Sequence, residues 1–156
     1  MTDEQTVQQA IKHSLLTEKD AMDFYQTAAQ YVQNQDARQM LELLAMEERE
    51  HAEWFHRICN NIDLDEFLQL IDSGPNPDSA WLAQLNKIQD LSNGELEVLQ
   101  LALRQEKDLE KELTEIAAST SDPDVRQIYE ANIESTRRHF EMIAEEYNRL
   151  KELLVD

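Results

Sequence analysis

The placement of glycine and proline constrains the fold of this chain more than any other feature. Its 156 residues contain 2 glycines and 3 prolines, and all five lie between positions 74 and 123. These two residue types most often end helices, so the stretches before and after that interval are free to form long ones. Hydrophobic residues make up 41% of the chain, which is enough for a core. The sequence therefore predicts an all-α fold.

Apolar residues at helical spacing predict four long helices. They cover about residues 2–33, 36–60, 95–118 and 121–154. Asp36 and Gln39 resemble a capping box at the start of the second helix, and residues 92–95 are expected to cap the third. Pro123 suits an early position of the fourth helix.

The long helices pair into two antiparallel hairpins, over about 2–60 and 95–154. Residues 61–94 between them hold most of the helix breakers and predict a crossover with one or two short helices. A helix of ~25 residues is ~38 Å long, so a connection that returns along it needs about this much chain. The whole chain, 1–156, is thus expected to form a single four-helix-bundle domain with one long crossover.

The net charge of the chain limits the classes of partner that it is expected to bind. It holds 33 acidic residues against 14 lysines and arginines, which gives a formal charge of −19. Phosphate backbones and anionic membranes attract basic proteins, so neither nucleic acid nor a membrane is expected as a partner. The chain has no apolar run of membrane-spanning length, no signal-peptide pattern at its start, and one cysteine, Cys59, which excludes an internal disulfide. These features predict a cytoplasmic protein.

The two halves of the chain share a pattern at an offset of 88 residues. Over positions 36–53 and 124–141, 7 of 18 residues are identical without a gap, and His51 aligns with His139. The same offset aligns a Glu-Lys-Asp triplet in each half. We interpret the pattern as an internal repeat that arose by duplication of a helical hairpin.

Each predicted hairpin places a glutamate opposite a histidine. Glu18 precedes His51 by 33 residues, and Glu106 precedes His139 by the same 33 residues. The midpoint of each pair falls in the break between its two helices, so both members are expected at the same height in the bundle. Glu48 lies three residues before His51 and projects from the same helix face.

These five residues point to a metal site. Carboxylates on otherwise apolar stripes are costly to bury unless they are paired or bound to a metal. Mixed carboxylate and imidazole ligands suit iron or manganese, and zinc would also bind. In the alternative interpretation, the histidines only form hydrogen bonds with the carboxylates, as in a decayed site.

The chain resembles the ferritin-like di-iron carboxylate proteins, specifically the rubrerythrin-like group. That pattern has Glu on the first and third helices and Glu-x-x-His on the second and fourth. The resemblance is closest in Glu18-Lys-Asp-Ala-Met-Asp-Phe-Tyr25 and Glu47-Glu-Arg-Glu-His-Ala-Glu53, and it covers essentially the whole chain. It implies a ferritin-like bundle that holds one or two iron ions, with manganese and zinc as alternatives. The implied metal ligands are Glu18, Glu48, His51, Glu106 and His139, and Tyr25 resembles a tyrosine that these proteins place near the metals.

The sequence departs from the family pattern at position 136. The fourth helix should carry Glu three residues before His139, and it carries Thr136. In the family this residue supplies one of two carboxylates that bridge the metals, so the second ion is expected to bind more weakly or to be absent. One cysteine cannot build the family's rubredoxin domain, so an external electron donor is expected.

The resemblance implies a candidate non-haem iron oxidoreductase of peroxidase type. Its substrate would be peroxide or O₂, in oxidative-stress defence. One alternative is iron handling, as a ferroxidase or ferritin-like store. The other is a non-catalytic helical interaction module with a degenerate metal site, for which Thr136 is the strongest sequence argument. Association as a homodimer is a further alternative to a single chain.

Overall fold

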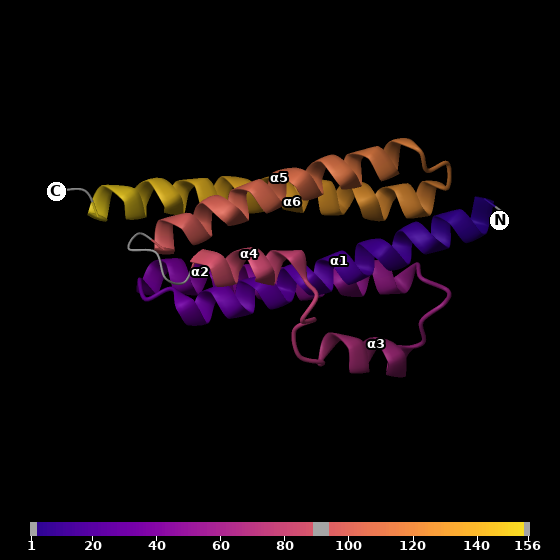
Figure 1. Cartoon of the computed structure of the whole chain (residues 1–156). Helices are drawn as coiled ribbons and strands as arrows, with labels where there is room; N and C mark the ends of the chain where they lie inside the picture. Colours follow the sequence, from indigo (N-terminus) through magenta and orange to yellow (C-terminus); the bar gives the residue numbers. More distant parts are fainter. Residues whose placement is uncertain (1–2, 89–93, 155–156) are drawn as a thin grey trace.

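The computed structural model describes residues 3–88 and 94–154, and within them it contains six helices and no strand (Figure 1). The helices are α1 Asp3–Tyr31, α2 Gln35–Arg57, α3 Leu64–Ile71, α4 Ala80–Ile88, α5 Gly94–Ala118 and α6 Pro123–Leu154. Four of them are long and two are short, so the predicted all-α fold is confirmed.

The long helices pack in two hairpins, as Figure 1 shows. α1 lies along α2, and α5 lies along α6. The two short helices occupy the connection between the hairpins. α4 contacts both α1 and α5, whereas α3 packs on the end of α2, where the ring of Phe67 stacks on His56 with centroids 4.5 Å apart.

The ends of the helices follow local capping rules. α2 begins after Asn34, whose side chain accepts a hydrogen bond of 3.0 Å from the backbone N–H of Ala37. The capping box predicted at Asp36 was therefore wrong by two residues, because asparagine is itself among the strongest N-caps. Pro123 is the first residue of α6, as predicted, and Asp122 caps it by accepting from the N–H of Asp124. Of the cap predicted for α5 at 92–95, residues 92 and 93 lie outside the described residues, and α5 begins at Gly94.

Buried apolar side chains from all six helices form the core. Trp81 of α4 joins the crossover to the bundle, because its ring meets Phe24 edge-on with centroids 5.2 Å apart. Within the described residues, no helix combines the length and the apolar character that a membrane span requires.

Candidate metal centre

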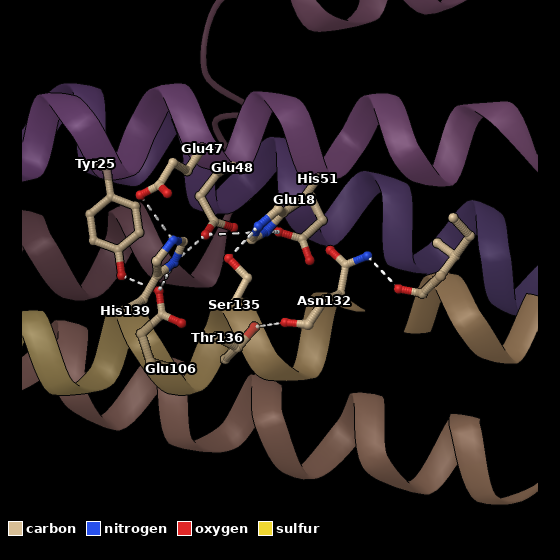
Figure 2. Close-up of polar contacts among 11 residues, drawn as sticks. Glu18, Tyr25, Glu47, Glu48, His51, Glu106, Asn132, Ser135, Thr136 and His139 are labelled. Carbon is tan, nitrogen blue, oxygen red and sulfur yellow. Dashed lines mark hydrogen bonds and ion pairs between the residues drawn. The ribbon is translucent and has the colours of Figure 1, made fainter. Parts of the chain in front are cut away.

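Glu18, Glu48 and His51 come together in the middle of the bundle (Figure 2). Glu18 lies on α1, and Glu48 and His51 lie one turn apart on α2. His51 Nδ1 is 3.5 Å from Glu18 Oε2 and 3.7 Å from Glu48 Oε1. All three side chains are buried, and each offers one donor atom within 4.8 Å of the others. The spacing that predicted this meeting in the first hairpin is thus matched by the geometry.

Glu48, Glu106 and His139 form a second group beside the first. His139 of α6 places Nδ1 2.9 Å from Glu48 Oε1 and 3.5 Å from Oε1 of Glu106, which lies on α5. The three side chains are buried, with donor atoms again within 4.8 Å of one another. The ring of His139 stacks on that of His51 with centroids 5.3 Å apart. Glu48 belongs to both groups and therefore stands where it could bridge two ions.

Most donor atoms of the two groups have no hydrogen-bond partner, although they are buried. The unpartnered atoms are Glu18 Oε1 and Oε2, Glu48 Oε1 and Oε2, Glu106 Oε2, His51 Nδ1, and His139 Nδ1 and Nε2. The 2.9 Å contact between His139 and Glu48 lacks the angles of a hydrogen bond. Buried polar atoms without partners are costly. Because the atoms of each group lie within 4.8 Å of one another, each group could hold a divalent cation.

The pKa values of the site follow from burial and from charge crowding. Burial raises the pKa of Glu48 well above its usual range, and the carboxylates of Glu18 and Glu106 raise it further. Burial also acts to raise the pKa of Glu18, but contacts with Glu48 and His51 outweigh it and leave that pKa lowered. Burial acts to lower the pKa of His139, but Glu106 outweighs it and leaves the pKa raised. The raised pKa values favour the protonated forms of Glu48 and His139, and a bound cation would displace these protons.

The second ring nitrogen of each histidine contacts a residue that the sequence analysis missed. His51 Nε2 is 2.8 Å from the buried hydroxyl of Ser135, and His139 Nε2 is 3.3 Å from Glu47 Oε2. A partner on the far nitrogen fixes which nitrogen of an imidazole is free to bind a metal. Both contacts therefore leave Nδ1 facing the carboxylates. The internal repeat could have indicated both residues, because Ser135 follows Glu47 by the same 88 residues that separate the two histidines.

Thr136 does not replace the carboxylate expected at its position. It is fully buried, and its hydroxyl donates a 2.8 Å hydrogen bond to the backbone oxygen of Asn132, on its own helix. A hydroxyl bonded in this way to the preceding turn satisfies itself locally. The two donor groups therefore contain three carboxylates.

Tyr25 lies beside the second group, in contact with Glu106. Its hydroxyl donates a 2.5 Å hydrogen bond to Glu106 Oε1. Burial raises the pKa of Tyr25 well above its usual range, and the negative charges of Glu106 and Glu48 add to the effect. The phenol therefore stays protonated. Trp81 covers it, with ring centroids 6.3 Å apart.

The two remaining histidines lie away from the centre. His13 Nε2 is 2.7 Å from Glu112 at the surface, and His56 Nε2 is 2.9 Å from the backbone oxygen of Ile62. Neither belongs to a group of potential metal ligands within the described part of the chain.

Comparison with known families agrees with this geometry. A family model described as Rubrerythrin matches residues 9–148. The chain belongs to the rubrerythrin family. No curated protein and no solved structure matches it. Rubrerythrins typically bind iron, and this rubrerythrin has two groups of buried side chains that could hold such ions. The matched range includes every residue of both groups.

Proposed function

We propose that this rubrerythrin binds iron at the two donor groups and uses it to reduce peroxide or O₂. The observation that carries the proposal is the set of buried, unpartnered donor atoms that converge from four helices around Glu48. A purely structural polar network would be expected to pair these atoms with one another. A cytoplasmic location, a role in oxidative-stress defence and an external electron donor are parts of the same proposal.

The ligands divide between two positions that share Glu48. Glu18 and His51 complete one position, and Glu106 and His139 complete the other. Carboxylate and imidazole donors suit iron and manganese, and zinc is a further alternative. Bound as Fe(II), the ions would supply the two electrons that convert hydrogen peroxide and two protons into two molecules of water.

The surrounding residues hold the ligands in place and exclude water. Ser135 forms a hydrogen bond with His51 Nε2, and Glu47 lies 3.3 Å from His139 Nε2, so Nδ1 of each ring faces the buried carboxylates. Tyr25 keeps its proton and donates it in a hydrogen bond to Glu106, which orients that carboxylate. Trp81 and Phe24 pack edge-on over the tyrosine ring and separate it from solvent.

The proposal is tested by peroxide consumption with protein that has been loaded anaerobically with Fe(II) and desalted. We expect one peroxide to be consumed for every two bound iron ions, and continued consumption when a soluble reductant is added. The variant Glu48→Gln should lose both the consumption by bound iron and the continued consumption with reductant, because it changes the shared ligand. Glu50→Gln makes the same change on an exposed position of α2 and should keep them. Peroxide consumption that is equal in the two variants would contradict the proposal.

Thr136 favours a second candidate, a non-catalytic helical module that kept the fold and lost the chemistry. Its buried hydroxyl serves its own helix, and the centre has three carboxylates. A chain that binds no iron, manganese or zinc and forms a stable homodimer would support this alternative. A ferroxidase or iron store is separated from the leading proposal by its substrate, because it would oxidise Fe(II) with O₂ and retain the ferric product.

A further inference from the structure

Asn132 is a buried polar side chain that the proposed ligand set does not use. It lies on α6, four residues before Thr136 and seven before His139, and none of its surface is exposed. Its Nδ2 donates a 2.8 Å hydrogen bond to the backbone oxygen of Ile128. Its Oδ1 has no partner. Because a buried acceptor without a partner is costly, this oxygen needs a physical explanation.

The register between α1 and α6 shows which residue Asn132 lies beside. The hydroxyls of Ser14 on α1 and Tyr129 on α6 are 2.8 Å apart, and Arg149 near the end of α6 donates a 2.9 Å hydrogen bond to Oδ1 of Asn34, which lies past the end of α1 and caps α2. Each contact joins residues 115 positions apart. α1 and α6 therefore run in the same direction, and Tyr129 of α6 lies level with Ser14 of α1.

On this register, Asn132 lies level with Glu18. Adding 115 to 18 gives 133, the position next to Asn132. Figure 2 shows the amide of Asn132 pointing toward the Glu18 carboxylate, on the side of the centre away from Tyr25. Both oxygens of that carboxylate lack a hydrogen-bond partner, like Asn132 Oδ1.

Three buried acceptor oxygens that face one region are stable there only with a cation or a proton among them. Turning the amide over would not remove the conflict, because Oδ1 would then face the backbone oxygen of Ile128. The contact with Ile128 thus fixes the amide with its carbonyl toward Glu18. An amide carbonyl is an oxygen donor of the kind that suits manganese and similar divalent ions.

We propose that Asn132 Oδ1 is a further protein ligand of the cation at Glu18, Glu48 and His51. This inference rests on the metal binding in the proposed function. With Asn132, that position has four donors. The added oxygen partly offsets the carboxylate that is missing at Thr136. Because Asn132 is neutral, it supplies an oxygen without the negative charge of a carboxylate. In the other half of the chain, 88 residues earlier, the corresponding residue is the buried Leu44, so the oxygen is present on one side of the centre only.

The test is titration with Mn(II), followed by calorimetry and by the electron paramagnetic resonance of free Mn(II). In Asn132→Leu, which keeps the volume and removes the oxygen, we expect one equivalent to bind at least tenfold more weakly. The equivalent that Glu106→Gln weakens should be unaffected. The exposed Asn148 of α6 provides the matched controls Asn148→Leu and Asn148→Asp, both expected to bind like the unchanged protein.

Asn132→Asp distinguishes a ligand from a residue that only positions Glu18. The aspartate keeps the oxygen and loses the N–H, so a ligand role predicts Mn(II) binding as tight as in the unchanged chain, or tighter. Binding as weak as in Asn132→Leu would overturn the ligand assignment, because it would show that the N–H matters. Unchanged binding in Asn132→Leu would overturn it too, while leaving the proposed function intact. An unchanged chain that binds no Mn(II), Fe(II) or Zn(II) would overturn both.

Discussion

Replacing Glu48 by Gln should stabilise the metal-free protein and abolish its response to metal. Glu48 is fully buried and belongs to both donor groups. Burial and the neighbouring carboxylates raise its pKa, so the folded chain holds a proton on Glu48 that the unfolded chain releases above its ordinary value of 4.5. Stability of the metal-free protein therefore falls as the pH rises above 4.5. Glutamine needs no proton, so the variant removes this loss.

The size of the effect follows from the spacing of the carboxylates. Within each group the donor atoms lie within 4.8 Å of one another. Two like charges at that distance repel by roughly 3 kcal/mol at an effective dielectric constant of about 20. One such repulsion sets the order of magnitude of the gain at neutral pH, which corresponds to a rise in Tm of about 6–12 °C for a chain of this size. The gain should shrink as the pH falls toward 4.5 and vanish below it, where the carboxyl is protonated in both states.

Metal should narrow or close the difference in stability between the unchanged chain and the Glu48→Gln variant. A ligand at about one hundred times its Kd stabilises a protein by about 2.7 kcal/mol, or about 5–10 °C here. The unchanged chain should show this rise with Mn(II), and Glu48→Gln should show none. Thermal unfolding by circular dichroism at pH 4.5 and 7.5, with and without Mn(II), measures all four values. Glu50→Gln, exposed on the same helix, should behave like the unchanged chain. A Glu48→Gln protein that is less stable without metal, and that is still stabilised by Mn(II), would refute the reasoning.

Three further predictions concern the same centre. Thr136→Glu adds a carboxylate at a fully buried position, so the free energy of unfolding of the metal-free protein should fall by about 1–3 kcal/mol. Calorimetry should show that the variant binds Mn(II) at least tenfold more tightly. Unchanged affinity would count against the interpretation that Thr136 stands where a bridging carboxylate is missing. Tyr25→Phe leaves Glu106 without its donor and should cost about 1–3 kcal/mol in urea denaturation, whereas an unaltered midpoint would show that the hydrogen bond contributes nothing. Because the pKa values of Glu48 and His139 are raised, Mn(II) binding should release protons and weaken as the pH falls; titration heats that do not depend on the ionisation enthalpy of the buffer would contradict this.

The positions of the helices could be predicted from the sequence because the helix breakers are few and confined. Pro123 begins α6 as expected, since its fixed φ suits the first turn. The start of α2 was misplaced, because Asp36 and the true cap, Asn34, both carry side-chain oxygens that can cap a helix. Capping rules alone do not decide between the two residues, because the choice depends on the connection that follows α1.

The meeting of Glu18 with His51, and of Glu106 with His139, could be predicted because each pair is centred on a hairpin turn. Helical periodicity alone could not predict the contact of His51 with Ser135, because that contact depends on how α6 is rotated against α2. Helical periodicity assigns residues to a face but does not fix the rotation between two faces. The duplication suggested by the 88-residue offset stays a hypothesis.

The most direct test of the account is the metal content of each chain. The protein is loaded anaerobically with Fe(II), desalted, and measured by elemental analysis, with Glu48→Gln as the reference. The account predicts two iron ions per chain, held with unequal affinity because the centre has three carboxylates, and a loss of both in the variant. Iron, manganese and zinc contents near zero in the unchanged chain would contradict it and leave a helical bundle without metal chemistry.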